Sequence, residues 1–482
     1  MTRFFGARLT CHRFLWRATV LVLSLAAVAL SACSDSTGPP SEPLDLLGRL
    51  NALPGVTARE IAPSYGYPRA FELDIVQPVD HDNPGGRTFT QRAYLSHADE
   101  AAPMVFGPYG YGATAESGQE LAAILQGNGL YVTHRYFPGS RPVPTDWSYL
   151  DIRQAAADHH HIVTLFRPLY ASVWVSAGAS KSGMTALFHR RFYPDDVDAT
   201  VAYVAPFMFD LGDERFTDHL RQTGTPEGKA RIHEFQRRLL EQQDSLIGRF
   251  EEWFPRNDLT LSVPSPPMYQ DAVDSYEWGF WQRHVFDYAD IPDPDAPYDA
   301  WIEHLAAATR LHFASDTWRD YFKAYVYQLY TELGSPAVDV SHLEDLLLHE
   351  SLDPRVEYSF PDDLPLVYDN GAMLDVVQWL QSHGDRIIYI YGSVDPWTGG
   401  AIELTGPADA LKIVQDGADH QVKILDLDDQ ATVLTTLGAW LGMDLSTVTT
   451  RSLTEPPPEP DLDLLFTLAP GVIGPPGVDP PL

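Results

Sequence analysis

The sequence predicts an α/β fold, in which a core with a mostly parallel sheet carries an inserted helical domain. Short apolar runs alternate with helical stretches between residues 103 and 204, which is the pattern of parallel strands joined by helical crossovers. This pattern stops near residue 208, gives way to helical sequence rich in aromatic residues, and resumes at residue 386. A chain of 482 residues is long enough for one large domain with such an insertion.

The N-terminal residues have the features of an export signal. They contain four arginines and no acidic residue, and an apolar run over residues 15–30 leads through small residues to Cys33. Residues 30–33 also resemble the bacterial lipobox, in which the cysteine is acylated and becomes the mature N-terminus. We therefore expect a lipoprotein signal over residues 1–32, lipidation of Cys33, a flexible tether over residues 33–50, and a location at the bacterial cell envelope. Ordinary secretion without lipidation and an uncleaved anchor are the alternatives.

Charge and cysteine content narrow the possible partners. Acidic residues number 66 and basic residues 33, and the net charge of −33 argues against nucleic acid and anionic lipid as partners. Membrane attachment is therefore expected only through the lipid anchor. The two cysteines are Cys11, inside the signal, and Cys33, so the exported protein is expected to hold no disulfide. No spacing typical of a metal site occurs, and we expect neither a metal nor a cofactor.

The order of the predicted elements sets the domain boundaries. Alternating apolar and polar residues over 71–78 and 88–95 predict two antiparallel strands. Core strands are predicted at 103–106, 130–133, 172–175, 199–204, 386–391 and 422–425. Helices are predicted near 116–126, 150–166, 232–253 and 428–441. The expected domains are a first core segment at 51–207, a helical cap at 208–363, a second core segment at 364–452 and a proline-rich tail at 453–482.

The segment 173–184 reads as a buried strand, a tight turn of small residues and a helix, with Ser180 at the apex. Such a turn lifts the serine hydroxyl clear of the sheet and directs the next backbone N–H at an oxyanion, as in the nucleophile elbow of α/β-hydrolases. Ser182 stands where the usual G-x-S-x-G pattern has glycine. Ser176 and Ser182 are rival nucleophiles, but neither lies at the apex. The segment therefore predicts an α/β-hydrolase core with Ser180 as its nucleophile.

A serine nucleophile needs a histidine base, and the base needs an acid that fixes its tautomer. In α/β-hydrolases the acid and then the histidine follow the serine along the chain, each on a loop at the carboxyl end of a strand. Asp395 directly follows a predicted core strand, and His420 stands just before the next predicted strand. We therefore predict that Ser180, Asp395 and His420 form a catalytic triad, with Asp419 as a rival acid beside the histidine.

The oxyanion hole is predicted to combine two backbone N–H groups. One belongs to Lys181, directly after the nucleophile, and the other comes from the glycine-rich segment 107–112. Glycines let the backbone of this segment turn its donors inward. We assign the second N–H to Tyr111. A merely flexible loop is the alternative.

Several motifs form an ordered set between residues 71 and 420. They include residues 77–81 and 89–92, 134–137 and 140–142, 146–147 and 154–158, 178–185, 190–198, 202–206, and 391–392 with 395–397. Together these motifs resemble the bacterial secreted tripeptidyl aminopeptidases. These are serine peptidases distantly related to the Pro-Xaa carboxypeptidase and dipeptidyl peptidase group. The resemblance implies the triad named above and the release of short peptides, often tripeptides and often after proline, from a free N-terminus. It also implies that the insertion is a cap that restricts access to chain ends.

Two departures from this family affect the expected substrate site. The family usually has a glutamate where this chain has Thr133, and Ser182 adds a hydroxyl beside the nucleophile. If that glutamate binds the amino group of the substrate, another carboxylate has to replace it, because a carboxylate binds an ammonium group well. Glu277 in the cap and Asp146 are the candidates for this role, although an acidic residue in so acidic a protein is more often simply solvated.

Three aromatic residues of the cap, Trp278, Phe280 and Trp281, are candidates for a flat apolar wall against a proline ring, or else belong to the cap core.

Two other functions fit the predicted elbow and the predicted fold. The first is a carboxylic ester hydrolase, since esterases share the elbow. The second is an inactive hydrolase fold that serves as a surface binding protein. Peptides remain the expected partners.

Overall fold

The computed structural model describes residues 44–115, 117–118, 120–347, 357–361 and 364–446. The chain divides into two units, residues 1–49 and residues 50–482, and the second unit contains the sheet and the helical insertion. The predicted signal, Cys33 and the predicted tail lie outside the described residues. Helix α1 (Leu46–Asn51) occupies the end of the segment predicted as a tether, which is a correction to that prediction. In the described part of the chain, no helix has the length and apolar character needed to span a membrane.

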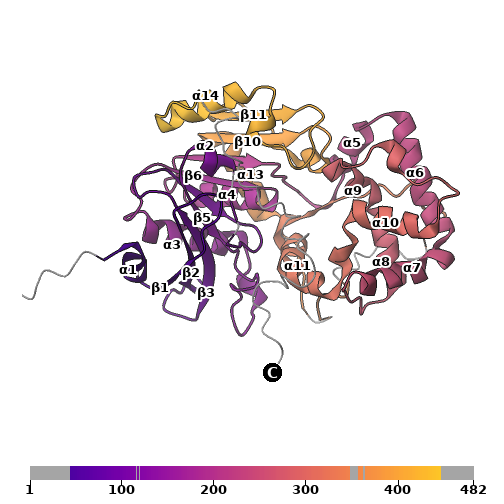
Figure 1. Cartoon of the computed structure of the whole chain (residues 1–482), viewed down its shortest axis with the longest axis horizontal. Coiled ribbons are helices and arrows are strands. Elements are labelled where there is room, and N and C mark those ends of the chain that lie inside the picture. Colours follow the sequence, from indigo (N-terminus) through magenta and orange to yellow (C-terminus); the bar gives the residue numbers. More distant parts are fainter. Residues whose placement is uncertain (1–43, 116, 119, 348–356, 362–363, 447–482) are drawn as a thin grey trace, which may run out of the picture. The chain divides into compact units, whose positions relative to one another are not determined.

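The core of the second unit is a nine-stranded sheet with the order β1-β2-β3-β5-β4-β6-β7-β10-β11 (Figure 1). β1, β2, β3 and β5 pair antiparallel, whereas β5, β4, β6, β7, β10 and β11 pair parallel. The predicted α/β fold with a mostly parallel sheet is therefore confirmed. The strands are β1 (Val56–Ile61), β2 (Arg69–Pro78), β3 (Thr88–His97), β4 (Met104–Pro108), β5 (Asn128–Val132), β6 (Trp174–Ala179), β7 (Ala199–Tyr203), β10 (Ile387–Gly392) and β11 (Ala410–Gln415).

Helices cover both faces of the parallel part of the sheet. Successive side chains of a strand point to opposite faces, and β10 shows the result. Ile388 and Ile390 pack in one apolar cluster with α2 and α14, while Ile387 and Tyr389 pack in another with α4 and α13. Burial on both sides explains why this strand reads as an unbroken apolar run. The core helices are α2 (Glu120–Ile124), α3 (Ile152–Phe166), α4 (Lys181–Phe192), α13 (Gly371–His383) and α14 (Gln430–Leu441).

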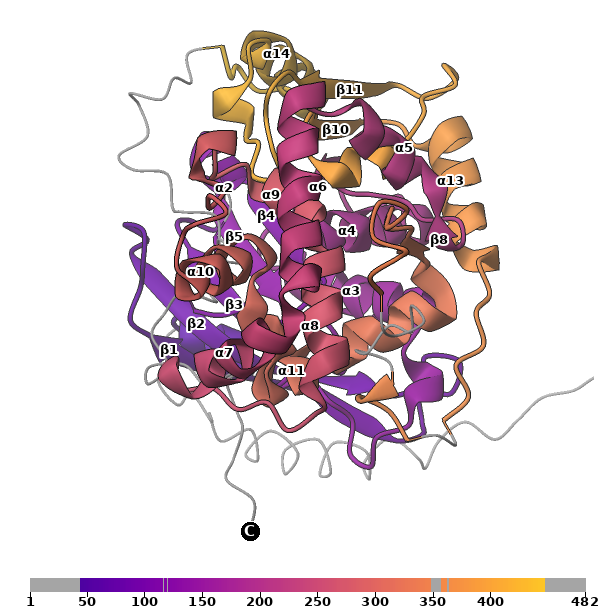
Figure 2. The same cartoon turned by 90° about the vertical axis from the view of Figure 1, so that its right-hand side faces the viewer.

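The helical cap lies between β7 and β10 in the sequence and has an apolar core of its own, in which Phe235, Phe250 and Tyr276 are fully buried or nearly so. Figure 2 shows α6 crossing in front of the other cap helices. A single helix was expected over residues 232–253, but the chain leaves the helical conformation at Gln242 and begins a second helix, α7. The cap elements are β8 (Leu211–Asp213), α5 (Glu214–Gln222), α6 (Pro226–Glu241), α7 (Gln243–Arg256), α8 (Ser265–Asp274), α9 (Tyr276–Arg283), η2 (Tyr288–Asp290), α10 (Tyr298–Thr309), η3 (Leu311–Ala314), α11 (Asp316–Gln328), η4 (Leu329–Leu333) and β9 (Ser335–Pro336).

The strand predicted at 422–425 is absent, and this prediction is wrong. The chain forms a single 3₁₀ turn there, η6 (Ile424–Asp426), and the last strand of the sheet is β11, which precedes His420. The backbone N–H groups of Ile424 and Leu425 donate to the buried carboxylate of Glu120, at 2.9 and 2.8 Å. Because a side chain already satisfies these two donors, the segment has no need of a strand partner.

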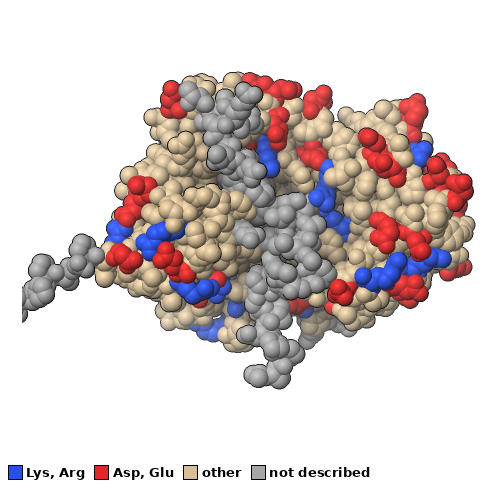
Figure 3. All heavy atoms as spheres, viewed as in Figure 1, with Lys and Arg blue, Asp and Glu red and all other residues tan. Residues whose placement is uncertain are grey.

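Acidic side chains are spread over the face of the molecule in Figure 3, with basic side chains scattered among them. Several of the arginines are paired, such as Arg237 with Asp345 at 2.7 Å. This view shows no large basic patch of the kind that binds a polyanion.

Candidate active site

Ser180 lies at the sharp turn between β6 and α4. Its backbone has φ 55° and ψ −128°, a left-handed conformation that is strained in a residue with a side chain. The turn is held by a hydrogen bond from the Ser180 N–H to the Tyr203 carbonyl oxygen on β7, at 2.8 Å. The structure therefore has the strand-turn-helix geometry that the sequence predicts for a nucleophile elbow.

Two glycines let the strand and the helix approach one another at this turn. A Cβ on Gly178 would lie 2.4 Å from the backbone of Ser182, and a Cβ on Gly183 would lie 2.8 Å from the Gly178 carbonyl oxygen. Both distances are far below a normal contact. The close approach is thus made at Gly183, one position after the glycine of the usual pattern, which leaves room for a side chain at Ser182.

Asp395 and His420 are joined by a hydrogen bond of 2.7 Å between Asp395 Oδ2 and His420 Nδ1. Asp395 follows the carboxyl end of β10, is completely buried, and accepts a second hydrogen bond at Oδ1 from the Trp397 N–H at 3.1 Å. The rival acid Asp419 instead accepts from the Gln421 N–H at 2.9 Å. Of the two acids beside the histidine, Asp395 is the one that contacts its ring.

The hydrogen bond to Asp395 orients the His420 ring and occupies only one of its two nitrogens. A carboxylate only accepts hydrogen bonds, so Nδ1 of His420 carries the proton and Nε2 keeps a lone pair. Nε2 is buried and has no hydrogen-bond partner among the described residues. The backbone N–H of His420 donates to the Gln282 carbonyl oxygen at the end of α9, at 3.0 Å, so the cap holds the histidine loop. His420 and Ser180 line the same cavity.

The glycine-rich loop after β4 lies beside the start of α4. In this loop the N–H of Gly110 donates to Ser182 Oγ at 3.0 Å, and the N–H of Gly112 donates to the Tyr321 hydroxyl at 3.1 Å. No described residue accepts a hydrogen bond from the N–H of Tyr111, the position assigned to the oxyanion hole. Tyr111 also lines the cavity. The free donor is thus at the predicted position.

Thr133 is hydrogen-bonded to the backbone at the end of this glycine-rich loop. Its side chain is buried, and its hydroxyl oxygen accepts a hydrogen bond from the Ala113 N–H at 3.0 Å. Thr133 is not part of the cavity wall. The residue at the position of the family's glutamate therefore has a structural contact in this chain.

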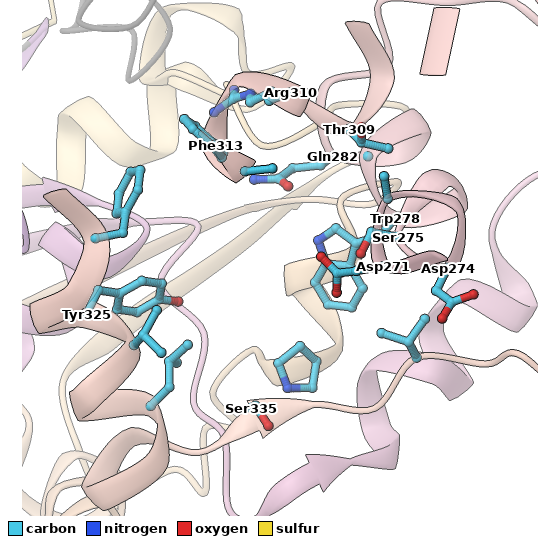
Figure 4. A pocket seen from close by; sticks show the side chains of 18 of the residues that line it. Asp271, Asp274, Ser275, Trp278, Gln282, Thr309, Arg310, Phe313, Tyr325 and Ser335 are labelled. Carbon is cyan, nitrogen blue, oxygen red and sulfur yellow. The ribbon is translucent and has the colours of Figure 1, made fainter. Parts of the chain in front are cut away.

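A cavity of about 1180 Å³ lies between the carboxyl ends of the core strands and the cap (Figure 4). Trp278 of α9 lines it and meets Trp397 edge to face, with ring centroids 4.9 Å apart. Trp397 in turn lies 6.2 Å from the His420 ring. This places an aromatic wall next to His420. Among the described residues no cluster of histidine, cysteine or acidic side chains is arranged to hold a metal ion.

Three residues predicted to bind substrate do not line this cavity. Glu277 bonds to His233 on α6, with Oε2 to Nε2 at 3.0 Å, and Trp281 is 3% exposed in the cap core. The reason is helical phase, since Trp278 and Gln282 occupy the cavity face of α9 while residues 277 and 281 face the cap. Asp146 caps the 3₁₀ helix η1 (Trp147–Tyr149) by accepting from the Ser148 N–H at 3.2 Å. The structure does not support these three assignments.

The cavity is instead lined by three acidic residues that the sequence reasoning missed, Asp271, Asp274 and Glu357. Asp271 and Asp274 lie three residues apart on α8, so they share a helix face, and both line the cavity. In Figure 4 they lie with Trp278 on the opposite side of the cavity from Tyr325. Oδ1 of Asp274 is buried and has no described partner. Burial, assisted by the charge of Asp271, raises the pKa of Asp274 to about 7. The spacing was the available signal, but α8 was not resolved as a helix from the sequence.

The chain is similar to known peptidases along most of its length. The family model described as PS-10 peptidase S37 matches residues 40–457. The prolyl tri/tetrapeptidyl aminopeptidase of Streptomyces mobaraensis is 34% identical over 441 residues, which cover 89% of this chain and 92% of that protein. Two similar solved structures each have 14% sequence identity to this chain. The proline iminopeptidase of Mycobacterium smegmatis has a TM-score of 0.40, and the match covers 76% of this chain and 98% of that one. An α/β hydrolase from Novosphingobium aromaticivorans has a TM-score of 0.31, and the match covers 80% of this chain and 98% of that one.

Proposed function

The chain belongs to the S37 family of serine peptidases, and we propose that it removes short peptides from free N-termini as a tripeptidyl or prolyl type aminopeptidase. The observation that carries this proposal is the bond between Asp395 and His420 beside a cavity that Ser180 also lines. The Streptomyces relative is a prolyl tri/tetrapeptidyl aminopeptidase, and this supports the substrate class. The cap over the cavity suits a substrate that enters by its chain end.

The proposed chemistry uses the triad in two steps. Nε2 of His420 takes the proton of the Ser180 hydroxyl as Oγ attacks the scissile carbonyl, and Asp395 stabilises the imidazolium that forms. The N–H groups of Lys181 and Tyr111 bind the oxyanion. His420 then returns the proton to the leaving amine, which departs and leaves an acyl-enzyme. A water molecule, deprotonated by the same nitrogen, attacks the ester carbonyl; the bond to Ser180 Oγ breaks, His420 returns the proton to Oγ, and the peptide leaves as its carboxylic acid.

We propose further that Asp271 and Asp274 bind the substrate's ammonium group. Two carboxylates on one helix face provide the charge. The Asp274 carboxyl has a hydrogen bond from Gln270, and its buried Oδ1 has no partner among the described residues. Charge-assisted hydrogen bonds are about twice as strong as neutral ones, so an ammonium group is a good donor for this site. In this assignment Asp271 and Asp274 take the amine-binding role for which Glu277 and Asp146 were candidates. They do so in place of the glutamate that the family has at the position of Thr133.

The substitution Asp274→Asn is expected to weaken substrate binding. A hydrogen bond to a charged group contributes about 1.5–3 kcal/mol, so the KM of a tripeptidyl anilide should rise roughly 10-fold or more, with a smaller change in kcat. In the wild type KM should rise as the pH falls from 8 to 6, because Asp274, with its pKa near 7, loses its charge. D274N should lack this rise. Asp244→Asn at the exposed start of α7 is the control, and an equal effect of the two substitutions would contradict the assignment.

The function itself is tested by blocking the substrate's amine. A tripeptidyl anilide with proline at the cleaved bond, its N-acetylated form and a short acyl ester are compared by kcat/KM. We expect the free tripeptide to be hydrolysed far faster than the acetylated form. Equal rates for the two peptides would exclude an aminopeptidase, and a preference for the ester would favour the ester hydrolase alternative.

We also propose that the chain is exported and anchored by lipid at Cys33, on the strength of the signal-like residues 1–32. Bacteria that express the protein and grow on a labelled fatty acid are expected to label the wild-type chain and not Cys33→Ser. Export of an unlabelled wild-type protein would favour ordinary secretion instead.

A further inference from the structure

The side chain of Lys181, the residue after the nucleophile, is buried instead of reaching solvent. It is 2% exposed, and its Nζ lies 5.4 to 5.6 Å from the ring centroids of Tyr111, Phe137 and Tyr325. Burial lowers the pKa of Lys181 well below the ordinary range of a lysine, with Glu332 acting in the opposite direction. Burying an amine in this way costs free energy unless it is hydrogen-bonded, and its partner is the carbonyl oxygen of Gly110.

Both polar backbone groups of Gly110 are therefore bound by the two residues that follow Ser180. Lys181 Nζ donates to its carbonyl oxygen, and Ser182 Oγ accepts from its N–H at 3.0 Å. The contact is close, because a Cβ at Gly110 would lie 2.6 to 2.9 Å from atoms of Lys181. The start of α4 thus clamps the loop that carries Tyr111.

This clamp fixes the direction of the Tyr111 N–H. In a trans peptide the carbonyl oxygen of one residue and the N–H of the next point in opposite directions. The Gly110–Tyr111 bond is trans, so holding the Gly110 carbonyl against Lys181 turns the Tyr111 N–H away from the lysine. That N–H is the one in the loop without a described partner, at a residue that lines the cavity.

We propose that Lys181 and Ser182 are positioning residues of the oxyanion hole. Lys181 Nζ holds the Gly110–Tyr111 peptide by its carbonyl oxygen, and Ser182 Oγ holds the preceding Tyr109–Gly110 peptide by its N–H, so that the Tyr111 N–H is aimed at the developing oxyanion. The inference rests on the proposed acyl-transfer chemistry. It gives a reason for the hydroxyl at Ser182, where the usual pattern has glycine. Lys181 does not act as the base, because its Nζ is bound to Gly110, whereas His420 holds the bond to Asp395.

The test compares Ser182→Ala and Lys181→Met with Thr185→Val. Thr185 is buried on the same helix, but its hydroxyl bonds to the Lys181 carbonyl oxygen and not to the loop, so it controls for the loss of a buried hydroxyl. Loss of one oxyanion donor lowers kcat about 100- to 1000-fold. We expect roughly a 100-fold loss for K181M and about 10-fold for S182A, with KM nearly unchanged and no loss for T185V.

A second readout separates positioning from general disruption. The affinity for a peptide aldehyde, which forms a tetrahedral adduct, should fall by the same factor as kcat, while KM stays constant. Unchanged kcat and aldehyde affinity in S182A would overturn the proposal even if K181M fails to fold. The variants are also compared with the wild type by their kcat and KM for an acyl ester. Hydrolysis of an ester passes through an oxyanion as well, so this comparison tests the clamp even if the aminopeptidase proposal fails.

Discussion

Replacing Ser180 with alanine is expected to lower kcat/KM by about 10⁴- to 10⁶-fold, the range seen when the nucleophile of a triad is removed. The reason is that no other hydroxyl lies at the apex between β6 and α4 beside the cavity. The Ser180 side chain makes no capping hydrogen bond at the start of α4, so alanine should leave the fold intact. Anilide hydrolysis and urea unfolding measure the two effects.

The control for this substitution is Ser176→Ala. Ser176 lies on β6, the strand that leads to Ser180, and is fully buried, and its hydroxyl shares a hydrogen bond of 2.8 Å with Thr200 Oγ1. It should keep wild-type kcat while losing a little stability, since one buried hydrogen bond contributes about 1 kcal/mol. Substantial activity in Ser180→Ala, or its loss in Ser176→Ala alone, would contradict the assignment of the nucleophile.

The largest effect on stability is expected from Asp158→Asn. Asp158 and Arg135 form a completely buried ion pair, with Nε to Oδ2 at 2.7 Å and a second nitrogen to Oδ1 at 2.8 Å. The same guanidinium donates to the carbonyl oxygens of Val79 and Tyr149, at 3.1 and 2.7 Å. Removing one partner of a buried pair leaves the other charge uncompensated and costs about 3–5 kcal/mol, which urea unfolding should show.

This stabilisation depends on pH in a definite direction. Burial acts to raise the pKa of Asp158, but the charge and hydrogen bonds of Arg135 outweigh it and hold the pKa below its usual value. A lowered pKa means that the stabilisation is present at neutral pH and is lost as the pH falls through the lowered value. Asp218→Asn, in an exposed pair with Arg221, is the control. Equal unfolding midpoints for the two variants would contradict a structural role for the buried pair.

The sheet and the elbow were predictable because they depend on local sequence. β10 is buried on both faces and reads as an apolar run, while the small residues around Ser180 indicate a turn with tight backbone contacts. β11 was missed because it is an edge strand whose residues are only partly buried, so its apolar signal is weak. Residues 422–425 were assigned to a strand because the sequence alone does not reveal that Glu120 captures their backbone donors.

The substrate side of the site was less predictable because it depends on how the cap helices are rotated. α9 carries aromatic residues on both its cavity face and its cap face, so its sequence does not reveal that Trp278 faces the cavity and Trp281 faces the cap core. For the same reason the sequence pointed to Glu277 on α9, and Asp271 and Asp274 on α8 were not among the candidates. The position of a carboxylate on a helix became informative only once the rotation of that helix was known.

The central claim, a reactive serine at position 180 oriented by Asp395 and His420, is tested most directly by covalent trapping. The folded wild-type protein is treated with a fluorophosphonate, digested, and analysed by mass spectrometry. We expect a single adduct on the peptide that contains Ser180, and a greatly reduced rate of labelling in Asp395→Asn. A folded protein that remains unlabelled, or an adduct on Ser176 or Ser182 instead, would contradict the account.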